Sequence, residues 1–337
     1  MKLKVEFKKY EKNPVLTVNP GNDWESKAVF NAGLIYKNGK FHMLYRAIGE
    51  YEKYISRIGY ALSDDGRNFR RMSDQPVLVP EYDYEQYGCE DPRITEIGSK
   101  LYVTYVAYNK TSQYGSHPQA ALAETTDFYH FKKLGLISPF ISINKDTVLF
   151  PEKINNQYVM LHRAHNWKKD GIRKTEGKFQ VKLNQSWLDW DLDEIPDHFP
   201  EKTSIWIADS EDLTHWHHHR VLFEPEFAWE NCKIGGGCPP VKTGFGWLII
   251  YHGIESLPDG KLIYRAGLAV LDLHDPSKVI YRHPVPIISP EHSYETEGDV
   301  PQVVFPEGAA LIDGMLYVYY GGGDKCINLA TGTIKPE

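Results

Sequence analysis

The sequence predicts an all-β protein with the fold of a five-bladed β-propeller, and three observations support this prediction. The 337 residues include 22 Tyr, 8 Trp, 27 Gly and 21 Pro, a composition that favours strands and turns. Short apolar runs alternate with tight turns, as they do in β-hairpins. The whole pattern recurs five times, and radial repetition is one way in which antiparallel proteins protect their strand edges. A β-sandwich is the alternative that the same pattern allows.

Each repeat begins with a hairpin, and the second strand of the hairpin gives the clearest signal. This strand is a run of aromatic and aliphatic residues, found at 41–46, 101–106, 158–163, 247–252 and 316–321. A turn such as Lys37-Asn38-Gly39-Lys40 precedes most of these runs. Another apolar stretch precedes each turn, at 33–36, 93–96, 148–150, 240–242 and 310–313. The order strand, turn, strand predicts five hairpins.

A third strand follows each hairpin and usually ends in an acidic turn. The corresponding segments are 58–66, 120–127, 205–212, 266–272 and 327–332. In the first three repeats an aromatic residue comes next, namely Phe69, then Phe128 or Phe131, then Trp216. We expect this aromatic residue to open a fourth, outer strand.

A polar insert separates the third hairpin from the strand that follows it, at about 166–203. The insert is too long for a plain turn, and we expect a loop or lid near one face of the protein. Its Trp187 and Trp190 suit either stacking on sugar rings or covering the insert itself. No interdomain linker is evident, so residues 1–337 are predicted to form a single domain.

Composition and charge argue against several classes of partner. The formal net charge is −7 and the pI is about 6.1, and no basic stripe is interleaved with aromatic residues, so nucleic acid is not an expected partner. Apolar runs such as 247–251 are far too short to span a bilayer. The N-terminal segment MKLKVEFKKY lacks the apolar core of a signal peptide. We therefore expect no membrane association and a cytoplasmic location.

Cysteine and histidine spacings do not predict a metal site or a disulfide framework. Cys89, Cys232, Cys238 and Cys326 form no Cys-x-x-Cys pair, which favours reduced thiols. Four histidines cluster at 215 and 217–219. Strand alternation would divide their side chains between two faces, so we expect no metal there.

Five polar segments occupy equivalent places around the first two strands of each repeat. They are 29–33 with Arg46 and Arg57, 88–93, 144–153 with 162–163, 229–240 with 251–253, and 298–308 with 320–324. In a propeller such positions converge on the central axis and can line one pocket. Carboxylates with aromatic residues suit glycosidic-bond chemistry, and clustered Arg, Lys and His suit an anion, above all phosphate. A ring of salt bridges that seals the axis is the structural alternative.

These segments resemble glycoside hydrolase family 130, the β-mannoside phosphorylases and related mannosidases. The stretches that carry the resemblance are 13–16, 29–31, 90–93, 148–154, 229–231, 233–237, 246–253, 275–279 and 298–301. Together they extend from residue 13 to about residue 325, nearly the whole chain. The resemblance implies a five-bladed propeller, in agreement with the repeats counted above.

The resemblance also implies roles for individual residues. Asp91, in the Asp-Pro-Arg motif, corresponds to the proton donor, which is thought to act through a hydroxyl of the sugar. The mannosyl unit would be held by Asn31, Arg46 and Asp299, and Arg93 and Asp146 complete the expected substrate-binding set. Phosphate would be bound by Arg57, Arg163, Lys233 and His252. No metal and no cofactor other than the co-substrate phosphate is expected.

The implied function is inverting phosphorolysis of β-mannosides, which gives α-mannose 1-phosphate. The partners are then a β-linked manno-oligosaccharide and phosphate, and the sequence is compatible with a homo-oligomer. The form Gly88-Cys-Glu-Asp-Pro-Arg93 resembles the branch that acts on β-1,2 linkages more than the β-1,4 branch.

Two other functions stay open from the sequence. An inverting β-mannosidase on the same fold would need a second carboxylate to activate water, for which Glu152 and Glu307 are candidates. A non-catalytic glycan-binding propeller would bind mannosides without turning them over.

Overall fold

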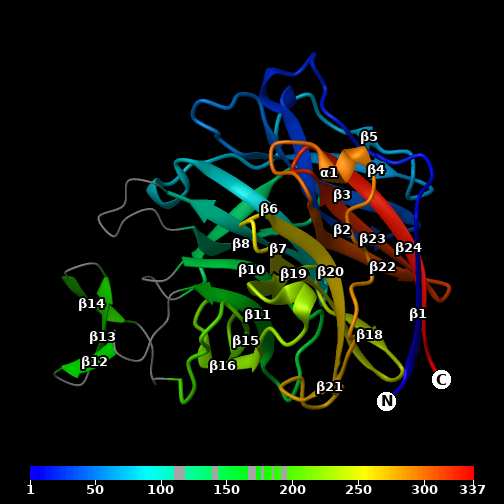
Figure 1. Ribbon diagram of the computed structural model, residues 1–337. Coiled ribbons are helices and arrows are strands. Elements are labelled where there is room, and N and C mark those ends of the chain that lie inside the picture. The colour runs from blue at the N-terminus through cyan, green and yellow to red at the C-terminus, as the bar shows by residue number, and fades with distance from the viewer. Residues whose placement is uncertain (110–117, 139–142, 166–171, 176–177, 184–185, 191–195) are drawn as a thin grey trace.

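The protein is a five-bladed β-propeller, as predicted, and its innermost strands form a closed ring (Figure 1). The computed structural model describes residues 1–109, 118–138, 143–165, 172–175, 178–183, 186–190 and 196–337. β2 contacts β6, β6 contacts β10, and β10 contacts β17. The ring is completed because β22 contacts both β19, the strand beside β17, and β2.

All five blades are antiparallel sheets, and in four of them the strands follow one another along the chain. Blade 1 consists of β2 (Ala28–Lys37), β3 (Lys40–Ile48), β4 (Arg57–Ser63) and β5 (Arg70–Arg71). Blade 2 consists of β6 (Gly88–Ile97), β7 (Lys100–Tyr108), β8 (Gln119–Thr125) and β9 (Phe131–Leu136). Blade 3 consists of β10 (Ile143–Leu149), β11 (Tyr158–His165), β15 (Ile205–Ser210) and β16 (His217–Phe223). Blade 4 consists of β17 (Lys233–Gly236), β19 (Gly246–Ser256), β20 (Leu262–Leu271) and β21 (Val279–Arg282), and β18 (Val241–Thr243) also pairs with β19.

Blade 5 is completed by the other end of the chain. Its strands are β22 (Val304–Ile312), β23 (Met315–Gly322), β24 (Cys326–Pro336) and the N-terminal β1 (Leu3–Lys9). The pairing runs from Leu3 opposite Pro336 to Lys9 opposite Ala330. Alternate residues of β1 pack on the blade, with Leu3 buried and Val5 and Phe7 partly buried. This strand was not predicted from the sequence.

The expected hairpins and outer strands are present. The predicted turn at Lys37-Asn38-Gly39-Lys40 joins β2 to β3. Phe69 directly precedes β5, Phe131 begins β9, and Trp216 directly precedes β16. The prediction that an aromatic residue opens the outer strand is therefore confirmed for the first three blades.

The insert at about 166–203, which we expected to be a loop or lid, includes regular structure. It contains three short strands, β12 (Ile172–Thr175), β13 (Lys178–Leu183) and β14 (Ser186–Trp190), which pair in that order into a small sheet. In Figure 1 this sheet lies outside the five blades. The side chains of Trp187 and Trp190 lie outside the described part of the structure.

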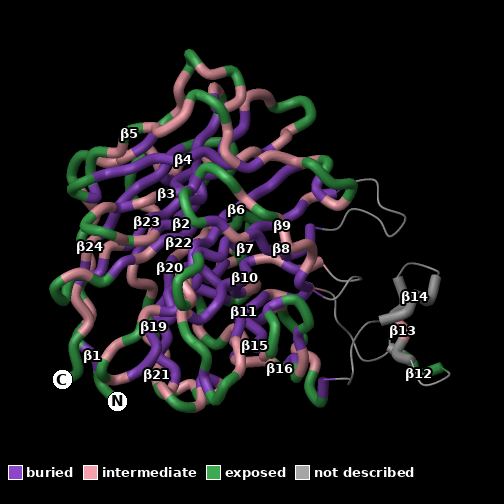
Figure 2. Tube along the Cα trace, turned by 180° about the vertical axis from the view of Figure 1, so that it is seen from behind, coloured by how far each residue is buried: buried purple, intermediate pink, exposed green. Residues whose placement is uncertain are grey.

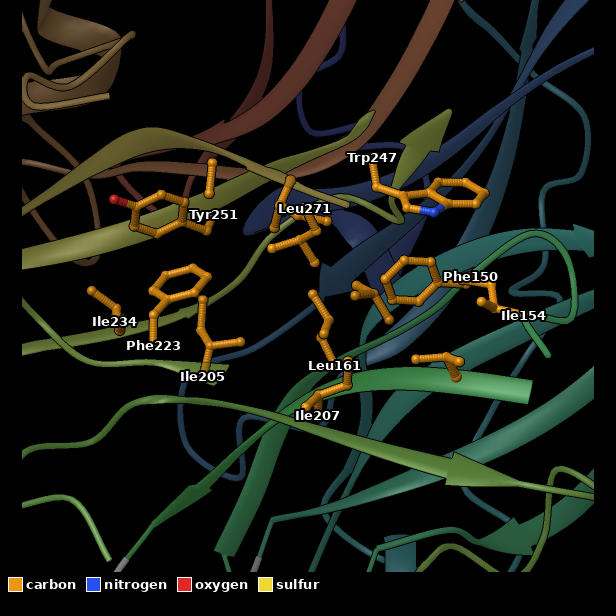
Figure 3. Close-up of a cluster of buried hydrophobic side chains, with 14 of the residues drawn as sticks. Phe150, Ile154, Leu161, Ile205, Ile207, Phe223, Ile234, Trp247, Tyr251 and Leu271 are labelled. Carbon is orange, nitrogen blue, oxygen red and sulfur yellow. The ribbon is translucent and has the colours of Figure 1, made fainter. Parts of the chain in front are cut away.

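Adjacent blades pack through apolar faces, and buried residues follow the strands while exposed ones mark many of the loops (Figure 2). The cluster between blades 3 and 4 is shown in Figure 3. It joins Phe150 and Leu161 of blade 3 to Trp247, Tyr251 and Leu271 of blade 4. Among the described residues, no helix has the length and apolar character needed to cross a membrane.

Four blades share a buried glutamate that was also not predicted from the sequence. The glutamates belong to the short helices η1 (Asp23–Glu25), η2 (Asp83–Glu85), η4 (Ala228–Glu230) and α1 (Ser293–Thr296), and each is fully buried. Each accepts a hydrogen bond from a tyrosine hydroxyl, in the pairs Tyr45–Glu25, Tyr105–Glu85, Tyr251–Glu230 and Tyr320–Glu295. Each also forms an ion pair, with Arg71, Lys133, Arg282 and Lys9 respectively. The sequence signal is an aromatic residue immediately before a glutamate, ahead of the first strand of a blade.

Blade 3 contains a chain of hydrogen-bonded buried histidines. His219 Nε2 donates to the carbonyl of Trp216 (3.1 Å), so its Nδ1 accepts from His162 Nε2 (3.0 Å). His162 Nδ1 in turn accepts from Asn144 Nδ2 (2.9 Å). Both rings are therefore neutral, and they join β10, β11 and β16. His218 is exposed and contacts Asp209 instead, and no group of metal-binding side chains is found among the described residues.

We expect this chain to make the protein sensitive to acid. Burial holds the pKa of His162 well below its usual range and lowers the pKa of His219 to about 4. An unfolded histidine titrates near pH 6.5, so between about pH 6.5 and pH 4 the unfolded chain binds more protons than the native protein. The buried histidines therefore make their full contribution to the free energy of unfolding above about pH 6.5, and this contribution is lost as the pH falls. For His219 alone, the free energy of unfolding decreases by about 3 kcal/mol at pH 4.

Urea unfolding of the wild type and of His219→Gln, from pH 7.5 to pH 4.5, measures this contribution. The difference in stability between the two proteins should shrink as the pH falls. His130→Gln, which changes an exposed histidine paired with Asp127, is the control and should follow the wild type at every pH. A difference between wild type and His219→Gln that is constant with pH would contradict the prediction.

Candidate active site

The inner strands of four blades carry a bulge at the same depth, and each bulge contains a polar residue. The pairing is interrupted between Phe30 and Ala32, Glu90 and Arg93, Lys145 and Val148, and Pro306 and Gly308. The residues at these points are Asn31, Asp91, Asp146 and Glu307. Three of them adopt left-handed backbone angles, with φ of 47° at Asn31, 51° at Asp91 and 56° at Asp146. Bulges redirect side chains and are frequent beside active sites, so these four explain why polar groups converge on the axis.

A cavity of about 340 Å³ lies at this point of convergence. Six residues predicted from the sequence line it, namely Asn31, Arg46, Asp91, Asp146, Arg163 and Lys233. Four further polar residues that were not among the predicted site residues also line it, namely Lys145, His165, Tyr264 and Asp324. All five blades contribute, and the volume is that of a site for a small ligand.

One side of the cavity is built around Asp91. Its Oδ1 accepts hydrogen bonds from Asn31 Nδ2 and from Arg46 Nη1, both at 3.0 Å. Arg46 also binds Glu90 at 2.6 Å and Ser56 at 2.9 Å, which fixes the guanidinium. Burial alone would raise the pKa of Asp91, but the charge of Arg46 and other nearby cations outweigh it and lower the pKa to about 2. In the free protein Asp91 is therefore a carboxylate.

A second part of the cavity lining is cationic and consists of Arg163 and Lys233. Arg163 Nε lies 2.9 Å from Asp146 Oδ2. Lys233 is half-buried, and no carboxylate lies within ion-pair distance of it in the described part of the chain. Burial and the charge of Arg163 lower the pKa of Lys233. An anion placed here would supply a compensating charge.

The glycine triplets 235–237 and 321–323 allow the backbone to pass close to polar side chains of neighbouring blades. A Cβ on Gly235 would lie 2.2 Å from Asp146 Oδ2, and a Cβ on Gly321 would lie 2.2 Å from Asn31 Oδ1. Any larger residue would push these two polar side chains out of place.

Three residues predicted to contact ligands do not line the cavity. Arg57 begins β4, the third strand of its blade, and is therefore two strands away from the axis. His252 is fully buried on β19 opposite Gly235, with its Nε2 3.7 Å from Asp146 Oδ2. Asp299 is exposed on the loop before β22 and accepts a hydrogen bond from Tyr54 (2.5 Å). None of the three lines this cavity, and the phosphate-binding roles of Arg57 and His252 and the mannosyl-binding role of Asp299 stay predictions.

Arg93, also predicted to bind substrate, has a buried side chain and does not line the cavity. Its guanidinium donates to the carbonyls of Gly237 (2.9 Å) and Asp91 (3.0 Å). It also pairs with Glu307 at 2.9 Å and, more weakly, with Asp146 at 3.5 Å. Arg93 thus ties four blades together beside Asp91.

Neither candidate for a water-activating base lies in the cavity. Glu152 lies on the turn between β10 and β11 and is paired with Lys242 at the surface (2.5 Å). Glu307 is fully buried beside Arg93, and burial raises its pKa well above the usual range. Asp324 lines the cavity instead, and burial with the charges of Asp91 and Asp299 raises its pKa to about 7.

Comparison with known proteins places the chain among proteins with a shared activity. A model of the glycoside hydrolase 130 family, described as beta-1,4-mannooligosaccharide phosphorylase, matches residues 6–186 and 196–336. A 1,2-beta-oligomannan phosphorylase of Thermoanaerobacter sp. (strain X514) is 40% identical over 337 residues, which cover 98% of each protein. A beta-1,2-mannobiose phosphorylase of the same strain is 38% identical, and the match covers 94% of each protein. The solved beta-1,2-mannobiose phosphorylase from Listeria innocua, in complex with beta-1,2-mannobiose, superposes with a TM-score of 0.76 at 28% identity, over 96% of both chains.

Proposed function

The chain belongs to glycoside hydrolase family 130, and we propose from this and from its site that it is a phosphorylase of β-linked mannosides. The relatives named for β-1,2-linked substrates support a preference for β-1,2 over β-1,4 linkages. The observation that carries the proposal is the division of the cavity. A buried aspartate held by Asn31 and Arg46 faces a cationic wall of Arg163 and Lys233.

This division fits a direct displacement. A phosphate bound by Arg163 and Lys233 presents one oxygen to the anomeric carbon of a mannosyl unit bound beside Asn31 and Arg46. The new carbon–oxygen bond forms as the glycosidic bond breaks on the opposite face, which inverts the β-linkage to α-mannose 1-phosphate. The leaving oxygen takes the proton that Asp91 delivers, and the protein needs no base because phosphate is the nucleophile.

Asp91 must gain a proton after the ligands bind, because its pKa is about 2 in the free protein. A phosphate dianion and a sugar that excludes water both disfavour a second negative charge in the cavity and so raise that pKa. Asp324 is the cavity carboxylate that carries a proton near neutral pH, since its pKa is about 7. The proton given to the leaving group is replaced by the one that hydrogenphosphate loses as it becomes a phosphate ester, so the reaction balances.

A β-mannosidase is the second candidate, and neither of the two glutamates considered for it lines the cavity. Water activation needs a second carboxylate that faces the anomeric carbon, at about 6.5–9.5 Å from the acid. Glu152 is at the surface and Glu307 is sealed behind Arg93. Incubation with β-1,2-mannobiose distinguishes the two enzymes. We expect α-mannose 1-phosphate and mannose in the presence of phosphate and no turnover without it, whereas release of mannose alone would identify a hydrolase.

Replacement of Lys233 by alanine tests the position of phosphate. We expect the KM for phosphate to rise about 10- to 100-fold, the effect of removing a hydrogen bond to a charged group, while the KM for the mannoside changes little. The matched control is Lys242→Ala, which removes a surface lysine of the same blade that pairs with Glu152. An unchanged KM for phosphate in Lys233→Ala would place the anion elsewhere.

A further inference from the structure

His165 lies on the cationic wall of the cavity, beside the residues to which phosphate is assigned. It is the last residue of β11 and lies opposite Ile143 of β10. Arg163 is two residues earlier, so both side chains point to the same face of the strand. Arg163, His165 and Lys233 all line the cavity, and they come from the neighbouring strands β11 and β17.

One nitrogen of His165 is anchored and the other is available to a ligand. Nδ1 lies 2.9 Å from the hydroxyl of Thr203. The carbonyl of Thr203 accepts from the backbone N–H of Ile234 (3.1 Å), the residue after Lys233. The ring is therefore fixed between β11 and β17, and Nε2 forms no hydrogen bond within the described part of the chain.

The surroundings of His165 keep it neutral in the free protein. Burial lowers its pKa, and the charges of Arg163 and Lys233 lower it further. The other ionisable groups around the cavity are Arg46 of β3, Asp91 of β6, Lys145 and Asp146 of β10, Tyr264 of β20 and Asp324, which follows β23, and His252 of β19 lies beside Asp146. Asp146 pairs with Arg163 and Asp91 with Arg46, and in the described part of the chain neither Asp324 nor any other carboxylate lies within ion-pair distance of His165.

A doubly charged anion between Arg163 and Lys233 would reverse this balance. It would neutralise the two cations that oppose protonation and would itself favour a positive ring at hydrogen-bond distance. We propose that His165 is a further contact of the phosphate and that it takes up a proton when the anion binds. This inference rests on the proposed function, because it requires the phosphate site formed by Arg163 and Lys233.

Sulfate is the probe that tests this, because it resembles phosphate but does not titrate between pH 5 and pH 8. Calorimetric titration of the whole protein with sulfate, at pH 7 in buffers of different ionisation enthalpy, counts the protons taken up. We expect uptake of up to one proton for each sulfate bound. We also expect the affinity for sulfate to rise as the pH falls from 8 to 6, by up to about tenfold per pH unit, the limit for linkage to one proton.

Two variants locate the proton. His165→Gln should still bind sulfate through Arg163 and Lys233, about tenfold more weakly at pH 6, with no proton uptake and no dependence on pH. His130→Gln, at an exposed site in blade 2, should behave as the wild type. Proton uptake that persists in His165→Gln would assign the proton to another group, such as Asp324, whose pKa is about 7, or His252, and would overturn the inference.

The wild-type titration alone separates this inference from the function on which it rests. Binding of sulfate or phosphate without proton uptake would overturn the role of His165 and leave the phosphate site in place. If neither anion binds, with or without β-1,2-mannobiose, the proposed phosphorolysis is contradicted and the role of His165 with it.

Discussion

Replacement of Asp91 by asparagine should lower kcat for phosphorolysis by about 10²- to 10⁴-fold, the usual contribution of a general acid. The amide side chain keeps an oxygen that can accept from Asn31 and Arg46, the two groups that hold Oδ1 of Asp91 at 3.0 Å. Arg46 also keeps its ion pair with Glu90. The fold and the binding of both ligands should therefore be preserved, and only the transferable proton is lost. Steady-state kinetics with β-1,2-mannobiose and phosphate measure the effect.

A second substrate shows whether the lost group is the acid. An aryl β-mannoside with an acidic phenol needs little protonation of its leaving oxygen, so Asp91→Asn should retain far more of its activity on it. Asp259→Asn is the control, since Asp259 is an exposed aspartate that pairs with Lys261 at the surface. An equal loss of kcat on both substrates, or near-normal kcat on mannobiose, would show that Asp91 is not the proton donor.

Much of the fold could be predicted because a propeller blade is a local structure. Hairpins such as β2 and β3 are joined by a two-residue turn, and their apolar runs are contiguous in the sequence. β1 could not be identified in this way, because it pairs with β24 at the other end of the chain. Its segment Leu3–Lys9 alternates apolar with charged residues over only seven positions, a weak signal without its partner.

Less of the site could be predicted, and the bulges are the main reason. Asn31, Asp91 and Asp146 lie at equivalent points of the repeat, so their convergence follows from the fold. The direction of each side chain depends on where the strand is interrupted, and the sequence does not reveal that position. After the bulge at Asp91, for example, Arg93 is buried and does not line the cavity. A resemblance to a family identifies such residues but not the depth at which each one lies.

Four polar residues of the cavity were not predicted to be site residues. Two of them lie within the polar segments singled out in the sequence, and two lie outside these segments. Lys145 and Asp324 belong to segments that had been singled out, at 144–153 and 320–324, and only the structure shows that their side chains reach the cavity. Tyr264 lies on β20 and His165 at the end of β11, beyond the hairpin motifs. Cavity residues from different blades are far apart in the sequence, and only the closed ring of blades shows which of them lie close together.

Replacement of Glu295 by alanine should destabilise the protein by about 3–5 kcal/mol, because it breaks a buried ion pair and leaves its partner uncompensated. Glu295 is fully buried and binds Lys9 Nζ (2.8 Å) and the hydroxyl of Tyr320 (2.8 Å). It also accepts from the backbone N–H groups of Glu291 and His292. Lys9 belongs to β1, so the glutamate fastens the strand that completes the last blade.

The neighbouring Glu291 provides the matched control for this prediction. It contacts the same Lys9 Nζ at 3.2 Å, but its side chain is 66% exposed. Glu291→Ala removes the same charge from the surface and should change the stability by less than about 0.5 kcal/mol. Urea unfolding of the two variants compares them, and hydrogen exchange should show faster opening of β1 and β24 in Glu295→Ala alone. Equal losses of stability in both variants would mean that the charge on Lys9, and not the buried network around Glu295, holds the closing strand in place.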